Sequence, residues 1–125
     1  MKKTALLFVA FALFNSPVHA EGDVAAGEKL FKRICGGCHQ VGEGAQGSFG
    51  PQLNAIIGRH SASTSDYQYS EAMKSANLVW DQPTLTAYLE APKKVVPGTR
   101  MIFWGLDDPE KLADLFAYLQ TFQPQ

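Results

Sequence analysis

The sequence predicts an all-α fold: a single small domain of short helices joined by long loops. Apolar residues recur at helical spacing in several stretches, most clearly from Leu112 to Leu119. Runs with the strict apolar–polar alternation of β-strands are not convincing anywhere in the chain. The only two cysteines stand three apart, in Cys35-Gly36-Gly37-Cys38-His39. Long loops are unusual in so small a domain unless they pack on something that the chain encloses.

The first twenty residues have the pattern of a secretory signal peptide. Lys2 and Lys3 precede an uncharged apolar run, and small residues end the segment, so we expect cleavage after Ala20. The run is too short to span a bilayer, which needs about 20 apolar residues. We therefore expect a single domain over residues 21–125, without stable membrane insertion, exported to an oxidising compartment that we infer to be a bacterial periplasm.

Charge narrows the classes of partner. The whole chain carries a net charge of −1, and removal of the two signal lysines makes the remaining domain more acidic. Nucleic-acid-binding domains have a basic electrostatic footprint. The sequence therefore argues against nucleic acid as a general partner.

The first helix is expected to begin at Asp23, which can cap its free N–H groups, and to run through Ile34 into the cysteine motif. Gly27 and Phe31 lie one turn apart on one face. A glycine within a helix costs about 1 kcal/mol relative to alanine. Gly27 therefore indicates close approach of another helix, although a tolerated surface glycine is the alternative.

The cysteine motif that follows has the spacing of a haem-attachment site. Positions i and i+3 face the same way on a helical turn, so Cys35 and Cys38 can form thioethers with the two vinyl groups of one porphyrin. His39 then stands under the iron as the proximal axial ligand. The sequence thus predicts one covalently bound haem c, with loops wrapped around it.

Three other interpretations of the motif remain open: a redox dithiol, a zinc half-site and a structural disulfide. A dithiol pair normally belongs to a βαβ pattern, which is not evident here. A tetrahedral zinc site needs four ligands, and only His39 and His60 could join the cysteines after signal removal.

Beyond the motif, a glycine-rich loop is expected over residues 41–51, and Leu53, Ile56 and Ile57 follow at near-helical spacing. Ser70 can cap a helix over residues 71–76, and Asp81 can cap another that ends at Ala91-Pro92. Residues 93–105 are predicted to be loop. Asp107 and Asp108 cap the last helix, whose apolar face comprises Leu112, Leu115, Phe116 and Leu119.

Met101 is the candidate for the sixth position on a haem iron. It follows Pro97-Gly98, a turn that would present one side chain inward. A thioether opposite a histidine raises the iron potential, as electron transfer requires. The alternatives are that Met101 only fills core space, or that Met73 is the ligand; Met73 falls in a predicted helix, where packing is its expected role.

Taken together, these motifs resemble those of the class I c-type cytochromes, in particular mitochondrial cytochrome c and its short soluble bacterial relatives. The resemblance runs from Gly22 to about Phe122. It rests on C-G-G-C-H at 35–39, G-P at 50–51, G-R at 58–59, Trp80, Y-L-E-A-P-K-K at 88–94, P-G-T-R-M-I-F at 97–103, and the last helix with Leu115, Tyr118 and Leu119.

The resemblance implies roles for individual residues. Gly27 and Phe31 would contact the last helix near Leu115 and Tyr118. The carbonyl of Pro51 would accept the second N–H of His39. The other residues that the resemblance places around the haem are Arg59, Tyr69 and Trp80 at a propionate, Tyr88 near the methionine, Phe103 beside the exposed haem edge, and Thr99 as a further cofactor-binding residue. Tyr88 and Phe103 could instead serve packing alone.

The surface departs from the family pattern. Ile34, Ser48, Asp107 and Asp108 occupy positions that resemble members of the lysine ring around the haem edge. A local basic cluster remains in Lys29, Lys32, Lys93, Lys94 and Arg100. Such a cluster is either an ordinary solvated face or, beside a haem edge, a means of steering redox partners. Met73 also replaces a residue that is commonly polar in the mitochondrial proteins.

These features predict a diffusible, monomeric one-electron carrier rather than an enzyme. By resemblance, its donor would be a bc-type complex and its acceptor a terminal oxidase, a photosynthetic reaction centre or a reductase. The alternatives are a haem enzyme or ligand sensor, such as a weak peroxidase that has lost the Met101 ligand, and a dithiol oxidoreductase that uses Cys35 and Cys38.

Overall fold

A computed structural model describes residues 21–124 of the chain, and the predicted signal peptide lies outside them. The fold is all-α, and no strand forms within these residues; the nearest approach to one is an isolated antiparallel bridge between His60 and Val79. The helices are α1 (Val24–Ile34), α2 (Glu71–Ala76), α3 (Gln82–Glu90), α4 (Pro92–Val95) and α5 (Pro109–Gln120). The prediction of short helices with long loops is confirmed.

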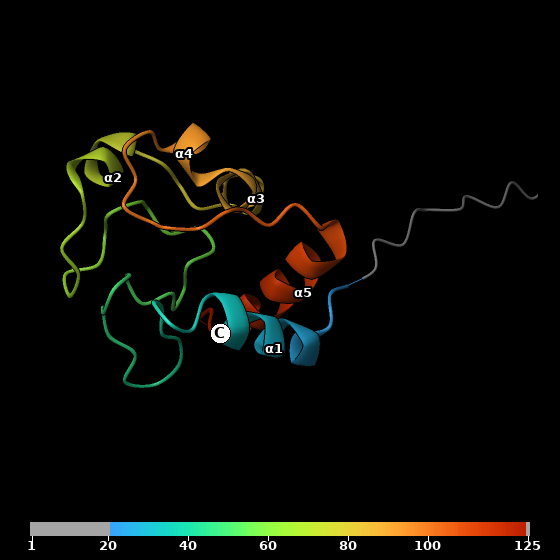
Figure 1. Ribbon diagram of the computed structural model, residues 1–125. Helices are drawn as coiled ribbons and strands as arrows, with labels where there is room; N and C mark the ends of the chain where they lie inside the picture. The colour runs from blue at the N-terminus through green and yellow to red at the C-terminus, as the bar shows by residue number, and fades with distance from the viewer. Residues whose placement is uncertain (1–20, 125) are drawn as a thin grey trace, which may run out of the picture.

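The first and last helices pack against each other, as Figure 1 shows. A Cβ atom at position 27 would overlap the backbone carbonyl of Asp114 and would meet the side chain of Tyr118. The ring of Phe31 lies 5.5 Å from that of Tyr118, centroid to centroid. The close-approach interpretation of Gly27 is therefore confirmed, and the helix interface extends from Gly27 along one face of α1.

Helix starts follow the predicted caps. The carboxylate of Asp23 accepts the N–H of Ala26, the hydroxyl of Ser70 accepts that of Met73, and the carboxylate of Asp81 accepts that of Thr84. Asp108, rather than Asp107, caps α5 by accepting the N–H groups of Glu110 and Lys111. Each cap satisfies donors that have no partner within the helix.

One local prediction is wrong. Residues 93–105 are not all loop, because Pro92 begins the short helix α4, in which the N–H of Val96 bonds to the Pro92 carbonyl. Conversely, the spacing of Leu53, Ile56 and Ile57 does not give a helix. Ala55 has a φ of 51°, outside the right-handed helical region, and the chain turns there instead.

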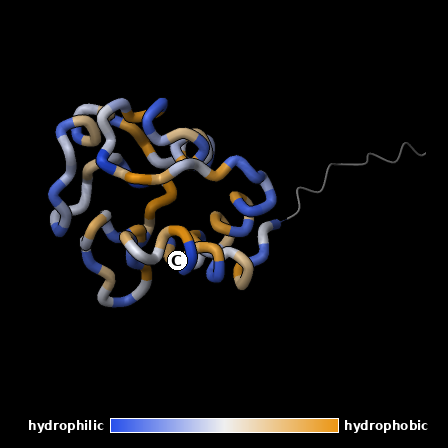
Figure 2. Tube along the Cα trace, in the orientation of Figure 1, coloured by the Kyte–Doolittle hydropathy of each residue, from blue (hydrophilic) through white to orange (hydrophobic). Residues whose placement is uncertain are grey.

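The core gathers apolar side chains from α1, α3, α5 and the intervening loops; its most buried members are Leu115 and Val96. In Figure 2, hydrophobic stretches of the tube face the interior, whereas hydrophilic ones mark the outer turns. Across residues 21–124, no helix is long and apolar enough to cross a bilayer.

Candidate functional site

A cavity of about 350 Å³ lies inside this fold, bordered by α1, α3, α5 and the loops around them. Most of its lining is apolar, and both cysteines, one histidine and two methionines face it. Every site residue predicted from the sequence contributes to its wall: Cys35, Cys38, His39, Pro51, Arg59, Tyr69, Trp80, Tyr88, Thr99, Met101 and Phe103. The structure thus brings these side chains to one place.

The cysteine motif continues the last turn of α1. The N–H of Cys35 bonds to the carbonyl of Phe31 at 2.8 Å, and the N–H of His39 bonds to the carbonyl of Cys35 at 2.9 Å. This turn holds Cys35, Cys38 and His39 at one edge of the cavity. Two sulfurs and an imidazole therefore reach the same enclosed volume, as covalent haem attachment requires.

His39 is fixed in one tautomer. Its Nδ1 lies 2.7 Å from the carbonyl oxygen of Pro51. Because a carbonyl only accepts hydrogen bonds, Nδ1 carries the proton and Nε2 keeps its lone pair. Burial lowers the pKa of the His39 ring below its ordinary value, against a smaller opposite effect of the Pro51 hydrogen bond, and the charge of Arg59 lowers it further. The ring is therefore neutral and able to ligate a metal at neutral pH.

Gly50 allows this arrangement. A Cβ atom at position 50 would collide with the ring of His39. The backbone N–H of Gly50 also donates to the carbonyl of Cys38 at 2.9 Å, which ties the glycine-rich loop to the cysteine motif. The loop after the motif thus closes directly over one side of the histidine.

Met101 lies on an irregular segment that hydrogen bonds hold in place. The hydroxyls of Tyr88 and Thr99 lie 2.8 Å apart, and the Thr99 oxygen also accepts the N–H of Met101 at 3.3 Å. Tyr88 comes from α3 and is buried, and burial raises the pKa of its phenol. A residue of the rigid core therefore positions the methionine loop.

Arg59 brings a partly buried positive charge to the cavity. Its guanidinium donates to the carbonyls of Asn54 and Gln52, both at 2.9 Å. Within residues 21–124, no carboxylate forms an ion pair with it. Neutral carbonyls do not compensate a charge in an apolar wall, so the site fits a ligand that carries an anionic group.

Tyr69 and Trp80 lie in the same wall as Arg59. The backbone N–H of Trp80 donates to the carbonyl of Arg59 at 2.8 Å, and the indole is buried. The phenol of Tyr69 lies 2.6 Å from the hydroxyl of Thr64. These contacts tie both residues into the cavity wall that Arg59 also lines.

The structure argues against the other interpretations of the cysteine pair. Burial, and to a lesser degree the neighbouring Cys38, raises the pKa of the Cys35 thiol to about 12. A redox dithiol needs a readily formed thiolate, so Cys35 is unsuited to that role. Among residues 21–124, no three His, Cys, Asp or Glu side chains gather as a metal cluster, which removes support for a zinc site.

The donor set as a whole fits haem. An apolar cavity would accept the porphyrin face, the cysteines its vinyl groups, the neutral His39 its iron and the Arg59 guanidinium a carboxylate. A zinc site would need a cluster of about four ligating side chains instead. A redox dithiol would not need an apolar cavity beside it. The fold and site define a class of protein: a small helical domain built around one haem.

Some wall residues were not predicted from the sequence. Tyr67 packs edge to face on Tyr69, with ring centroids 4.9 Å apart, and its hydroxyl donates to the carbonyl of Phe49 at 3.1 Å. Its only sequence signal is its place two residues before Tyr69. Phe49 and Ile102 also line the cavity, although neither belongs to a helical apolar pattern.

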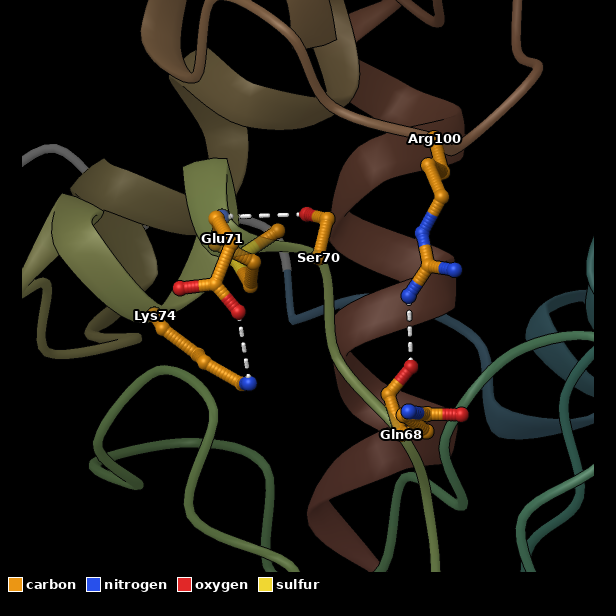
Figure 3. Close-up of polar contacts among 6 residues, drawn as sticks. Gln68, Ser70, Glu71, Lys74 and Arg100 are labelled. Atoms are coloured by element: carbon orange, nitrogen blue, oxygen red, sulfur yellow. Dashed lines mark hydrogen bonds and ion pairs between the residues drawn. The ribbon is translucent and has the colours of Figure 1, made fainter.

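Two residues of the basic cluster, Lys32 and Arg100, are held by contacts of their side chains. Lys32 pairs with Glu28 at 2.6 Å on α1. The guanidinium of Arg100 donates to the carbonyl of Gln68, as Figure 3 shows beside the Ser70 cap and the Glu71–Lys74 pair of α2. Lys29, Lys93 and Lys94 are exposed, on α1 and α4. The cluster is therefore a set of separate side chains on three segments.

Comparison with known proteins agrees with this assignment. Residues 24–123 match the family model described as "Cytochrome c". The chain is 44% identical to cytochrome c2 of Rhodomicrobium vannielii over 97% of both chains. It is 53% identical to cytochrome c2 of Agrobacterium tumefaciens over 79% of this chain and 91% of that one. The solved structure of cytochrome cH from Methylobacterium extorquens matches with a TM-score of 0.73 and 42% identity, over 80% of this chain and 99% of that one.

The chain belongs to the cytochrome c family. That family binds one covalently attached haem c, for which Cys35 and Cys38 have the required spacing, and its members carry electrons. The sequence prediction of a class I c-type cytochrome is thereby confirmed.

Proposed function

We propose that this protein is a diffusible one-electron carrier in which His39 and Met101 would both hold the haem iron. When bound, haem c supplies a reversible Fe(III)/Fe(II) couple. The observation that carries the proposal is the hydrogen bond from His39 Nδ1 to the Pro51 carbonyl, which leaves Nε2 free toward a cavity that Met101 also lines. Two protein ligands would leave no position for a substrate at the metal, so we infer that the protein carries electrons rather than catalysing a reaction there.

The chain's own groups set the properties of the site. Pro51 orients the imidazole and strengthens it as a donor. The thioether of Met101 favours the reduced metal, and the Tyr88–Thr99 pair keeps its loop in place. Arg59, Tyr69 and Trp80 line the wall at which a haem propionate would be held, and Phe103, which also lines the cavity, would lie at the haem edge. Few of these groups need to move when one electron is gained or lost.

We further propose that the protein works in the periplasm after cleavage at Ala20. The basic residues at the start of the chain and the short apolar run after them support export. The donor would be a bc-type complex and the acceptor a terminal oxidase, a reaction centre or a reductase. Electron-transfer complexes are small and transient, below about 1,200 Å² of buried area, so the protein would be a monomer between encounters.

Replacement of the proposed distal ligand tests this function. Met101→Ala should lower the reduction potential, because a soft thioether no longer favours ferrous iron, and should open the iron to external ligands. Potentiometric titration of the haem-loaded protein measures the first effect. An unchanged potential would show that Met101 does not ligate. Met73→Leu is the matched control, because Met73 lines the same cavity from α2.

Carbon monoxide distinguishes a carrier from a ligand-binding haem protein. The reduced native protein should not bind carbon monoxide at neutral pH, since His39 and Met101 would both hold the iron, whereas reduced Met101→Ala should bind it. Absorption spectra before and after exposure report this. Rapid binding by the native protein would instead support a ligand sensor or a weak peroxidase.

A further inference from the structure

The segment after α5 holds a loop that lies far from it in the sequence. The side-chain amide of Gln123 donates to the carbonyl of Ile57 at 2.8 Å, and its oxygen accepts the N–H of the same residue at 3.3 Å. One residue earlier, the carbonyl of Phe122 accepts the N–H of Ala55 at 3.0 Å. We call Phe122 and Gln123 the tail clasp. It fixes the backbone of a loop that precedes it by 66 residues at Ile57.

The loop has an unfavourable backbone conformation at Ala55. Its φ of 51° lies in the left-handed region, which residues with a Cβ atom rarely adopt. Such a conformation persists where the surrounding structure determines it, and it is found most often at functional sites. The hydrogen bond from Ala55 to Phe122 is one determinant of this kind. The tail clasp therefore holds the loop in a shape that its own residues do not favour.

The position of Arg59 depends on the shape of the same loop. The guanidinium donates to the carbonyls of Asn54 and Gln52, both at 2.9 Å. Asn54 directly precedes Ala55, so a change of the backbone at Ala55 would turn the carbonyls that orient the guanidinium. The cationic side chain lines the cavity and is partly buried. A link of backbone contacts thus runs from the tail clasp to a charge in the cavity wall.

We propose that Gln123 is a positioning residue for Arg59: through Ile57 it fixes the loop over residues 52–59 and so holds the positive charge of Arg59 at the cavity. The proposal rests on the electron-carrier function. A positive charge in the wall favours the reduced form of a bound haem, because ferrous iron carries one positive charge fewer than ferric iron. Loss of the contact should therefore lower the reduction potential, although Gln123 does not line the cavity itself.

The first test measures the contact by hydrogen exchange in the haem-loaded protein. In Gln123→Ala the N–H of Ile57 should exchange about tenfold faster, the factor that corresponds to one net hydrogen bond. The N–H of Gly58 bonds to the carbonyl of Trp80 at 2.8 Å and should keep its native rate. An unchanged rate at Ile57 would overturn the proposal. Equal acceleration at Ile57 and Gly58 would mean a general loss of stability and would also overturn it.

The second test measures the reduction potential by potentiometric titration. Gln123→Ala should lower the potential, in the same direction as Arg59→Leu and by a smaller amount, because the charge stays in the protein but is held less firmly. Gln120→Ala is the matched control, since Gln120 is exposed in the last turn of α5, and it should keep the native potential. A residue that only stabilises the fold would leave the potential of the folded protein unchanged. A native potential in Gln123→Ala would therefore contradict the proposal.

A double-mutant cycle tests whether Gln123 acts through Arg59. Added to Arg59→Leu, Gln123→Ala should cause no further shift of the potential, because the charge that it positions is absent. Arg59→Lys provides a second background that keeps the charge. Its single ammonium replaces the planar fork that reaches two carbonyls, so the shift should shrink there too. Full shifts in both backgrounds would show that the tail clasp acts by another route, and the assignment would be wrong.

Failure of this proposal can be separated from failure of the carrier function. Gln123→Ala should not bind carbon monoxide when reduced, because Met101 is unchanged. A native potential in Gln123→Ala, in a protein whose potential falls in Met101→Ala, overturns the positioning role alone. Rapid carbon monoxide binding by the native protein, or an unchanged potential in Met101→Ala, would instead overturn the carrier function.

Discussion

Tyr88 joins the buried core to the loop that carries Met101. Its ring packs on Trp80, with centroids 5.0 Å apart, and its hydroxyl meets that of Thr99. Thr99 in turn accepts the N–H of Met101. A single side chain thus links α3 to the proposed distal ligand through one intermediate hydroxyl.

Tyr88→Phe should keep the ring packing and remove this link. We expect a loss of about 0.5–1.5 kcal/mol of stability, the net value of one buried hydrogen bond, together with a changed reduction potential. Denaturant unfolding and potentiometry of the holoprotein measure the two effects. Tyr67→Phe is the control, because its hydroxyl bonds to the Phe49 carbonyl and not to the methionine loop. A potential unaffected by Tyr88→Phe would show that the hydroxyl link does not influence the metal.

Gly27 determines how closely the terminal helices approach. Gly27→Ala should destabilise the protein by about 1–3 kcal/mol, because a methyl group there overlaps the Asp114 carbonyl. Helix propensity alone predicts the opposite sign, a gain of about 1 kcal/mol. Thermal unfolding distinguishes the two. Gly37→Ala, where an added methyl group meets nothing within 4 Å, should change stability far less.

At the scale of the element, α5 depends on its cap. The hydrogen bond from Lys111, with help from the backbone N–H groups of Lys111 and Glu110, lowers the pKa of Asp108 below its ordinary value of 3.8. When folding lowers the pKa of a carboxyl group, the group contributes its full stabilisation at pH values above its pKa in the unfolded chain. The contribution is lost as the pH falls through the pKa that the group has in the folded protein.

Asp108→Asn keeps an oxygen for the cap and removes the charge. The native protein should therefore be more stable than Asp108→Asn at pH 7, and the difference should shrink below about pH 4 as the native carboxylate is protonated. Denaturant unfolding at a series of pH values measures the difference. Asp107→Asn, one residue earlier and outside the cap, should not show this narrowing. A difference that persists undiminished at pH 2 would contradict the cap as its cause.

An element could be predicted from the sequence when the contacts that define it join residues close together in the chain. Asp23, Ser70 and Asp81 cap helices by bonds to residues three further on, so sequence spacing reveals them. α4 has no side-chain cap and spans one turn, so nothing in its sequence distinguishes it from a loop. The turn at Ala55 is held by a distant residue, through its N–H bond to the Phe122 carbonyl, and no local pattern predicts it.

For the molecule as a whole, the cavity takes the place of a packed centre. Its mostly apolar lining comes from α1, α3, α5 and the loops around them, and core side chains without packing partners lose the contacts that stabilise a fold. Small domains are stable by only about 5–15 kcal/mol in total. The fold therefore depends on the group that fills the cavity.

Removal of the attachment points tests this dependence. The double variant Cys35→Ala, Cys38→Ala, made without haem, should lose cooperative unfolding and much of its helical circular dichroism. The native sequence loaded with haem should unfold cooperatively. Single Cys38→Ala keeps one thioether site and should retain haem and a folded structure of lower stability. A cooperatively unfolding, helical double variant would show that the protein part folds alone.

More of the residues that line the cavity could be predicted from the sequence than of the exposed residues around its opening. Cys35, Cys38 and His39 are adjacent in sequence, and the resemblance supplied the rest of the wall. Phe49, Ile102 and Trp104 are exposed and could not be recognised, because exposure results from how distant loops meet and leaves no periodicity in the sequence. Tyr67 was not recognised from the sequence for the same reason.

The pairing of α1 with α5 has a consequence for the order in which the protein matures. α1 carries the cysteine motif at its end, and α5 finishes only at Gln120. Until that residue has been synthesised, α1 lacks its main packing partner. A helix of 11 residues is marginal in water by itself. The thiols of Cys35 and Cys38 therefore lie beside a helix that gains its main packing partner only when α5, the last helix to appear, has formed.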